Sequence, residues 1–223
     1  MIREFGSGEI VYLIWAARWT LMLSAIAFVS GGALGFVLTV LRVAPSRPLN
    51  WLAAGYVQLF QGTPLLMQLF VFYFGFGIFG YDVPAIVAAS VALTLYAAAF
   101  LGEIWRGCIQ AIPAGQWEAA RALGLRFLPA MGLVVLPQAF RIAIPPTVGF
   151  LVQLVKNTSL ASIVGYVELT RAGQVINNST FQPFSVFIVV ALIYFAICFP
   201  LSVLSRRLER RLAVGVPVAR DVP

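Results

Sequence analysis

The residues with the most distinctive chemistry lie between positions 115 and 124, where polar, charged and aromatic side chains interrupt long apolar runs. The segment consists of Gly115, Gln116, Trp117, Glu118, Ala119, Ala120, Arg121, Ala122, Leu123 and Gly124. Pro113 before it and Gly124 at its end are typical of the start and the stop of a helix. With Trp117 and Leu123 holding one side of that helix to its own protein or to the lipid interface, Glu118 and Arg121 face outward. We expect this outward side to bind a partner.

Residues suited to catalysis or metal binding are scarce. The chain contains no histidine, which is the commonest general base and metal ligand. Cys108 and Cys198 lie in apolar surroundings, without the spacing of a metal site or a disulfide framework. No acid pair, no nucleophile with its base and no Gly-x-x-x-x-Gly-Lys-Ser/Thr phosphate loop occurs. We therefore expect no enzyme activity and no metal or cofactor bound by this chain.

The composition places the chain in a membrane. Of its 223 residues, 61% are hydrophobic and 10% are charged, and the mean hydropathy is +0.94. An average soluble domain carries about 25% charged residues, so this chain has too few to cover itself in water. The net charge of +7 does not indicate nucleic-acid binding, because the basic residues flank apolar runs. We expect one transmembrane domain over residues 1–223, in contact with lipid and with no nucleic acid.

The apolar runs predict an all-α, polytopic fold with about five transmembrane helices. A span needs roughly 20 apolar residues, and the runs suggest spans at about 19–41, 56–79, 83–105, 142–160 and 184–205. The first run exceeds the apolar core of about 7–15 residues in a cleaved signal, so we expect it to be retained. In the fourth, the pair Pro145–Pro146 predicts that the helix begins at Pro145. The polar residues 168–183 are expected to form a loop.

The second span is interrupted by the polar stretch Gln61–Pro64. Pro64 removes a backbone donor and kinks or ends a helix. In one interpretation the break is a loop at the cytoplasmic interface, and the true span starts at Pro64. In the other, its polar groups line a substrate path, because freed backbone groups inside a bilayer must be buried in protein or face a wet cavity.

Two further patterns concern packing. Gly31, Gly32 and Gly35 belong to a strip of small residues in the first span, which is typical of close contact between helices. Glu103 and Arg106, near the end of the third span, have the spacing of an i,i+3 ion pair. Neither pattern by itself indicates a binding site.

Basic residues are distributed unevenly between the two ends of the five spans. One side holds Arg42, Arg47, Arg106, Arg121, Arg126, Arg141, Arg206, Arg207, Arg210, Arg211 and Arg220. The other side holds only Arg3, Arg18, Lys156 and Arg171. By the positive-inside rule the first side is cytoplasmic. We therefore expect the N-terminus outside, the C-terminus in the cytoplasm and residues 115–124 facing the cytoplasm.

A motif in the polar segment resembles the signature cytoplasmic loop of permease subunits of binding-protein-dependent (type I) ABC importers. The motif is Glu118-Ala119-Ala120-x-x-x-Gly124, followed after nine residues by Val134-x-Leu136-Pro137. Val134 is a departure, since the family usually has Ile there. Other segments resemble the polar amino acid branch, which carries histidine, glutamate, glutamine, arginine or opines. These segments are Gln61–Leu66, Ile112–Gly124, Lys156–Leu160 and Leu169–Gly173.

The resemblance extends from about Trp19 to Arg211 and implies a type I ABC importer permease fold. Two permease subunits, which are copies or paralogues, would surround the pathway. A coupling loop at about 107–137 would dock in a groove of an ATP-binding subunit dimer, which alone binds ATP and Mg. The docking residues would be Gln116, Trp117, Glu118, Ala119, Ala120, Arg121 and Gly124. An extracytoplasmic binding protein would deliver an amino acid to the bacterial inner membrane.

An amino acid zwitterion needs a donor for its carboxylate and acceptors for its ammonium. Polar residues inside spans are costly and rare unless they are used, so they predict a pathway lining. The candidates are Gln61, Thr63, Gln153, Lys156, Asn157, Thr158 and Ser159. Two alternatives remain open, in which Lys156 reaches the outer interface and the hydroxyl groups bond between helices.

Two alternatives to this interpretation remain open, one for the pair Glu118 and Arg121 and one for the function of the whole chain. Glu118 and Arg121 could form an i,i+3 pair within their helix instead of docking a partner. The chain could also be a secondary, ion-coupled amino acid transporter that acts without an ATPase. Such transporters usually contain intramembrane carboxylates and inverted repeats. Only Glu103, near a helix end, fits the first feature, and no repeat is apparent.

Overall fold

The computed structural model describes residues 4–78 and 80–212, and the regular structure in this part of the chain is helical, with no strand. The longest helices are α1 (Ser7–Val43), α4 (Ala85–Gln110), α7 (Leu136–Asn157) and α9 (Pro183–Leu212). The shorter ones are α2 (Arg47–Gly62), α3 (Leu65–Ile78), α5 (Ala114–Ala122), α6 (Phe127–Ala130) and α8 (Leu169–Thr180). A π-helical turn, η1 (Met131–Val135), precedes α7, and a 3-10 turn, η2 (Thr158–Ser162), follows it. The predicted all-α class is confirmed, while Arg3, Phe79 and Arg220 lie outside the described residues.

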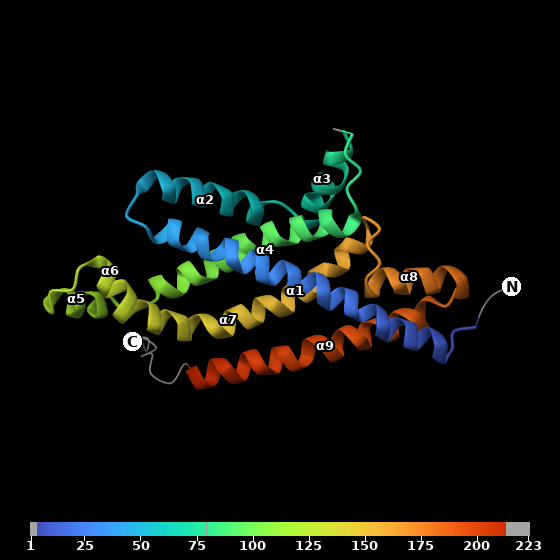
Figure 1. The fold of residues 1–223 in the computed structure, drawn as a ribbon. Coiled ribbons are helices and arrows are strands. Elements are labelled where there is room, and N and C mark those ends of the chain that lie inside the picture. The colour runs from blue at the N-terminus through green and yellow to red at the C-terminus, as the bar shows by residue number, and fades with distance from the viewer. Residues whose placement is uncertain (1–3, 79, 213–223) are drawn as a thin grey trace, which may run out of the picture.

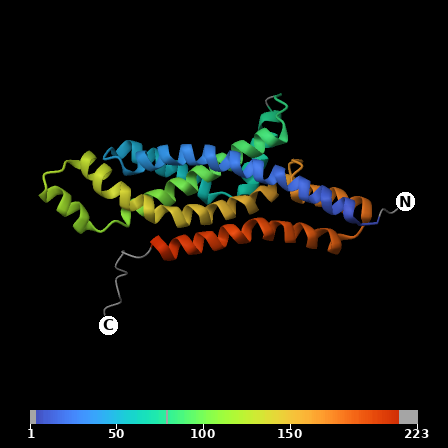
Figure 2. The same ribbon diagram turned by 60° about the horizontal axis from the view of Figure 1, so that its bottom comes forward.

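The long helices lie side by side in an elongated bundle (Figures 1 and 2). Among the described residues, four stretches are long and apolar enough to span a membrane: α1, α4, α9 and the helical run Phe127–Ser162. The bent pair α2–α3 is a fifth when it is counted as one span. α5 and α6 extend from one end of the bundle, and α8 lies at the other end beside the start of α1 (Figure 1). This architecture agrees with the prediction of about five spans.

Small residues bring α1 and α4 into direct backbone contact. A Cβ added to Gly31 would lie 2.5 Å from the Cβ of Ala97, and one added to Gly35 would lie 3.1 Å from a backbone oxygen of α4. Thr39 of α1 adds a hydrogen bond across the contact, since its Oγ1 donates to the carbonyl oxygen of Gly102 of α4 as well as to that of Gly35 in its own helix. Helices in lipid associate through such close packing, because the lipid tails are as apolar as the helices. The strip of small residues is therefore the packing surface of α1.

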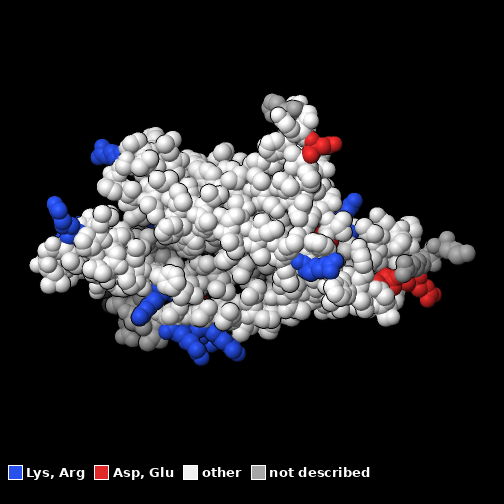
Figure 3. Space-filling model, in the orientation of Figure 1, with Lys and Arg blue, Asp and Glu red and all other residues white. Residues whose placement is uncertain are grey.

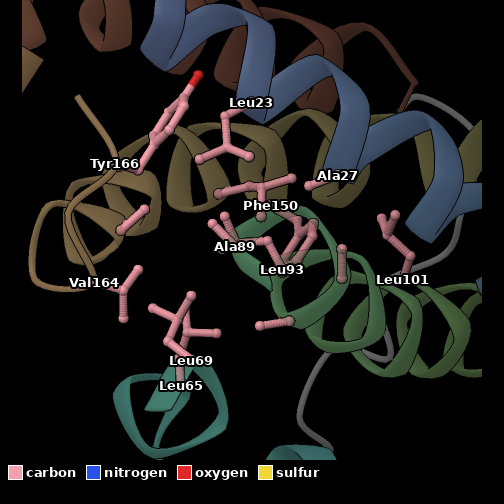
Figure 4. Close-up of a cluster of buried hydrophobic side chains, with 14 residues drawn as sticks. Leu23, Ala27, Leu65, Leu69, Ala89, Leu93, Leu101, Phe150, Val164 and Tyr166 are labelled. Carbon is pink, nitrogen blue, oxygen red and sulfur yellow. The ribbon is translucent and has the colours of Figure 1, made fainter. Parts of the chain in front are cut away.

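A buried apolar cluster joins α1, α3, α4 and α7 (Figure 4). It includes Leu23, Ala27, Leu65, Leu69, Ala89, Leu93, Leu101 and Phe150. Phe150 of α7 also stacks on Phe100 of α4, with the ring centroids 5.7 Å apart. A second cluster, which contains Leu13, Leu169 and Val186, joins the start of α1 to α8 and α9. Together the two clusters fix α7, α8 and α9 around the α1–α4 pair.

The chain bends by 100° between α2 and α3. The 16 residues of α2 first carry it about 24 Å away from the end where α1 stops. The break at Thr63–Pro64 therefore lies along the bundle and not at that end, which argues against a loop at the cytoplasmic interface (Figure 1). The side chain of Gln68 stabilises the break, because its Nε2 donates to the carbonyl oxygens of Phe60 and Thr63 and to Thr63 Oγ1.

The helix of the fourth span does not begin at Pro145, so that prediction is wrong. α7 continues through Pro145–Pro146, and the helical run starts at Phe127. Ser205 Oγ of α9 donates to the carbonyl oxygen of Pro145, and Thr147 Oγ1 donates to that of Ala143. A transmembrane helix tolerates proline where neighbouring helices and Ser or Thr side chains bind the backbone around it.

Residues 168–183 are not a loop, because they contain helix α8. The carboxylate of Glu168 accepts a hydrogen bond from the N–H of Arg171 in the first turn, and Phe181 ends the helix with φ of 54°. Leu169, Ala172 and Ile176 recur at helical spacing and are buried against α1 and α9. The polar composition of this segment reflects the other, more exposed side of the helix.

The α1–α4 contact predicts different outcomes for two neighbouring glycines. Gly31→Ala should destabilise the protein by about 1–3 kcal/mol, because the new methyl group overlaps Ala97 and forces the helices apart. In Gly32→Ala the added Cβ would lie 3.7 Å from Trp105, which is ordinary contact, so this control should be neutral or stabilising by up to about 1 kcal/mol. Thermal unfolding in detergent measures both. Equal stability of the two variants would contradict this packing.

Candidate functional site

The candidate site is α5 and the turn that ends it. Gly124 has φ of 75°, a left-handed conformation that suits glycine. The N–H of Gly124 donates to the carbonyl oxygen of Arg121 at 2.9 Å, and the N–H of Leu125 donates to that of Ala120 at 3.0 Å. This pair of bonds is the Schellman motif, which satisfies the last carbonyl groups of a helix. The predicted stop at Gly124 is therefore present, and it gives the helix a defined end.

Trp117 holds the inner side of α5 to the rest of the chain. Its ring stacks on Phe127 of α6, with the centroids 6.0 Å apart, and it packs against a buried cluster that contains Ile109 of α4 and Val135 of η1. Ala120, on the same side, is 2% exposed. Leu123 does not share this role, because 79% of its surface is exposed. The sequence thus predicted one of the two apolar contacts correctly.

The outer side of α5 is exposed. It presents Gln116, Glu118, Ala119 and Arg121. Within residues 4–78 and 80–212, neither Glu118 nor Arg121 forms an ion pair, so the structure does not contain the alternative i,i+3 bridge between them. Two opposite charges and a small residue are therefore free to meet another protein surface.

A polar cluster lies along α4, before the chain reaches α5. Glu103 pairs with Arg106, as the spacing predicted, and its carboxylate also lies 3.7 Å from a guanidinium nitrogen of Arg42 in α1. Arg42 in turn donates to the side-chain oxygen of Asn50 in α2 at 2.7 Å. These bonds join α1, α2 and α4 near the end of the bundle that carries α5.

The predicted pathway residues on α2 lie at the break. Gln61 and Thr63 are both exposed. Gln61 Nε2 donates to the carbonyl oxygen of Ala99 in α4 at 3.2 Å, and Thr63 Oγ1 donates to that of Leu59 at 2.8 Å. Gln68 was not predicted, although it is 6% exposed and its Oε1 has no hydrogen-bond partner in the described structure. A polar residue one turn after Pro64 in an apolar helix was the signal that could have identified it.

The predicted pathway residues around the end of α7 differ in what their side chains do. Gln153 Nε2 donates to Asn157 Oδ1 at 3.2 Å, and Gln153 and Lys156 are exposed. Thr158 is fully buried and donates to the carbonyl oxygen of Val155, while Ser159 donates to that of Lys156. The two hydroxyl groups thus donate to the backbone of their own helical turn and not between helices, and their role in the pathway stays a prediction.

Both groups of polar residues approach the same part of α4. Gln61 binds the backbone at Ala99, and the Asn157 side chain interacts with the phenol of Tyr96, one helical turn away. Tyr96 and Phe100 pack against one another with tilted rings, and both stack on Phe150, which makes an aromatic surface between α4 and α7. The fold therefore brings Gln61 and Asn157, which are far apart in sequence, to a similar depth in the bundle.

Glu168 forms a buried network that the sequence did not reveal. It is 0% exposed, and its Oε2 accepts from Tyr194 OH of α9 at 2.7 Å and from Thr20 Oγ1 of α1 at 3.2 Å. Burial raises the pKa of Glu168, and hydrogen bonds to the carboxylate, from the backbone of α8 and from these hydroxyl groups, oppose the rise. The network ties α1, α8 and α9 together at the end opposite α5.

Most of the chain matches a known protein family. Residues 31–214 match the model of the "Binding-protein-dependent transport system inner membrane component". The chain belongs to this family. The protein is therefore an inner-membrane permease, a transport subunit and not an enzyme, and ATP hydrolysis in such systems resides on a separate chain. Membership also sets aside the alternative of an ion-coupled secondary transporter.

Curated relatives resemble the permease over most of its length. It is 40% identical over 193 residues to the probable glutamine ABC transporter permease protein GlnM of Bacillus subtilis, covering 86% of this chain and 89% of the relative. It is 37% identical to the L-cystine transport system permease protein TcyB of the same organism, covering 87% and 83%.

Solved structures share the fold of the permease. The "crystal structure of an amino acid ABC transporter with histidines" aligns with a TM-score of 0.86 and 33% identity, covering 90% of this chain and 94% of that one. An inward-facing structure of the MetNI methionine ABC transporter aligns with a TM-score of 0.68 and 23% identity, covering 91% and 95%, and it supports the fold alone.

The buried network predicts a loss of stability when its phenol is removed. Tyr194→Phe should cost about 1–3 kcal/mol, because a buried carboxylate loses a hydrogen-bond donor. At about 2–4 °C for each kcal/mol, the melting temperature in detergent should fall measurably. Tyr81→Phe is the matched control, since Tyr81 is 67% exposed. A melting temperature equal to that of the control would contradict the network.

The raised pKa of Glu168 predicts a pH dependence of the stability. As pH rises above the ordinary glutamate pKa of about 4.3, the unfolded chain loses this proton before the folded one does, so the free energy of unfolding falls until pH passes the raised pKa. Glu168→Gln should remove this part of the slope in melting temperature against pH. An unchanged slope in the variant would contradict the assignment.

Proposed function

We propose that this permease forms the membrane pathway of an ATP-driven amino acid importer, together with a second permease that is a copy or a paralogue. The observation that carries the proposal is the exposed side of α5, held rigidly at one end of the bundle. The names of the relatives support an amino acid as substrate, since they include permeases for glutamine and L-cystine. An amino acid ABC transporter among the solved structures gives the same support.

The docking surface for the ATP-binding subunit dimer is the outer side of α5. Glu118 and Arg121 make the charged contacts, Gln116 and Ala119 lie beside them, and Ala119 permits close approach. Trp117, Ala120 and Gly124 act from the inner side by holding the helix in place. ATP and Mg are bound by that partner dimer and not by this chain.

Movement of α5 passes to the spans through packing. Trp117 packs against a cluster that includes Ile109, a residue of α4, and α4 is in backbone contact with α1 through Gly31 and Gly35. Closure of the ATP-bound partner dimer therefore shifts the spans as rigid bodies and opens the pathway outward. ATP hydrolysis and release return the permease to the inward-facing state.

The proposed orientation puts α5 in the cytoplasm and the start of α1 outside. It rests on the excess of arginine at the α5 end, which includes Arg121, Arg126 and the arginines at the end of α9. The extracytoplasmic binding protein then delivers its amino acid at the end where α8 lies. This orientation agrees with the docking surface, because the ATP that drives the partner is cytoplasmic.

The proposed pathway lining consists of Gln61 and Thr63 at the break and Gln153, Lys156 and Asn157 on α7. The amide groups of exposed Gln61 and Gln153 and of partly exposed Asn157 offer both donors and acceptors to a zwitterion, and Lys156 offers a cation to its carboxylate. Thr158 and Ser159 support this surface by shaping the turn after α7, since their hydroxyl groups bind the backbone there.

The docking surface predicts that Glu118→Lys weakens association with the ATPase while the permease still folds and inserts. Like charges brought together at an interface cost up to several kcal/mol, and a cost of about 1.4 kcal/mol is a tenfold loss, so we expect about a tenfold or larger loss of affinity and of coupled ATPase activity. Asp82→Lys, an exposed acid on the α3–α4 connection, makes the same charge change away from α5 and is the control. Unchanged complex yield and ATPase activity in Glu118→Lys would exclude docking through this residue.

The pathway predicts altered uptake in Gln153→Ala and Asn157→Ala with the ATPase still bound. Each loses a polar contact to the substrate, so the half-saturating concentration should rise about fivefold or more, by about 1 kcal/mol for each hydrogen bond. Ser202→Ala is the control, because its hydroxyl donates to the carbonyl oxygen of Cys198 in its own helix. Wild-type rate and specificity in both amide variants would remove them from the pathway.

A further inference from the structure

The last turns of α9 carry four arginines on one side of the helix. With about 100° between successive residues, Arg206, Arg207, Arg210 and Arg211 fall within an arc of about 140°. All four are exposed, whereas Leu208 and Leu212 on the other side are partly buried. Among the described residues none of the four guanidinium groups forms an ion pair. Figure 3 shows basic side chains gathered over this end of α9.

Two phenylalanines continue the same side toward the middle of the helix. Phe195 is 60% exposed and Phe199 is 49% exposed, and their rings stack with centroids 5.0 Å apart. The spacing of Phe195, Phe199, Arg206 and Arg210 places them within an arc of about 60°. We call these four residues the Phe–Arg stripe. It is apolar at one end and cationic at the other.

The arginines of the stripe lie at the depth of lipid headgroups. Residues 184–205 carry no charge, and their 22 positions extend about 33 Å, close to the hydrocarbon thickness of about 30 Å. The headgroup layer adds about 5–7 Å on each side, which corresponds to the next three to five residues of a helix. α9 also ends short of α5 and α6 in both views of the bundle (Figures 1 and 2).

We propose that the Phe–Arg stripe binds an anionic phospholipid, with its phosphate on Arg206 and Arg210 and an acyl chain along Phe195 and Phe199. Guanidinium groups suit phosphate because they offer several donors in a planar fork. Arg207 and Arg211 lie beside the phosphate and add attraction to neighbouring headgroups. Glu209, which flanks the stripe, is the one acid on these turns and weakens this attraction.

The charge pattern favours a lipid over a protein on this surface. A protein interface usually has an apolar or aromatic centre surrounded by polar groups, whereas here the two characters lie one above the other along the membrane normal. A second copy of the permease docked through the same stripe would bring arginine against arginine. An anionic phospholipid matches this order, with its acyl chain beside the phenylalanines and its phosphate beside the arginines.

The test uses the full-length permease in detergent, with phosphatidylglycerol and phosphatidylcholine of identical chains added in equal amounts, and native mass spectrometry counts the lipids retained. We expect the wild type to retain phosphatidylglycerol preferentially. Arg206→Gln with Arg210→Gln should reduce that preference more than tenfold, since each basic residue near an anionic surface contributes about fivefold. Arg206→Lys with Arg210→Lys should keep most of it, and Glu209→Gln should increase it.

The control for lipid retention is Arg121→Gln with Arg126→Gln. This variant removes the same number of positive charges, but from a part of the bundle that extends beyond the end of α9. It should leave the preference unchanged, and 10 mM inorganic phosphate should not abolish the wild-type preference. The proposal is overturned by equal retention of both lipids in the wild type, by an unchanged preference in the Gln variant, or by competition from inorganic phosphate. Loss of ATPase binding or of permease pairing in the Gln variant, with lipid retention unchanged, would identify the stripe as a protein interface instead.

Discussion

The backbone contact between α1 and α4 is the constraint on which the other features depend. In lipid, apolar surface alone does not hold helices together, so two helices must approach closely enough for dispersion and weak polar bonds to act. Gly31, Gly35 and Gly102 remove the side chains that would keep these helices apart, and Thr39 donates a hydrogen bond to Gly102 across the gap. α5 follows directly after α4, so the same contact transmits a displacement of α5 to the rest of the bundle.

Irregular backbone occurs in this bundle where side chains satisfy it. Gln68 binds the carbonyl groups left by the break between α2 and α3, and Ser205 binds the backbone at Pro145. Polar side chains in this bundle therefore bind backbone groups that the helices leave unpaired, and those that stay exposed are the ones we propose for the pathway. Gln61 is exposed and Asn157 is partly exposed, whereas Thr158 is buried and its hydroxyl group donates to the backbone of its own turn.

Charge is arranged differently at the two ends. At the α8 end, Glu168 is buried among hydroxyl and backbone donors and joins α1, α8 and α9. At the α5 end, arginines are exposed on α5 and α9, and only Arg42 and Arg106 are paired with an acid among the described residues. A buried carboxylate needs several donors, while exposed guanidinium groups are free to bind a protein or a headgroup.

The sequence alone determined the features that depend on local composition and spacing: the membrane location, the helical class, the stop at Gly124, the Glu103–Arg106 pair and the close-packing strip at Gly31 and Gly35. Tertiary structure decided the rest. Local rules predicted a helix start at Pro145 and a loop at 168–183, and both predictions failed because contacts with other helices stabilise the backbone near Pro145 and bury the apolar side of α8. The joining of Thr20, Glu168 and Tyr194, and the approach of Gln61 and Asn157 to one turn of α4, depend on residues far apart in the chain, and only packing brings such residues together.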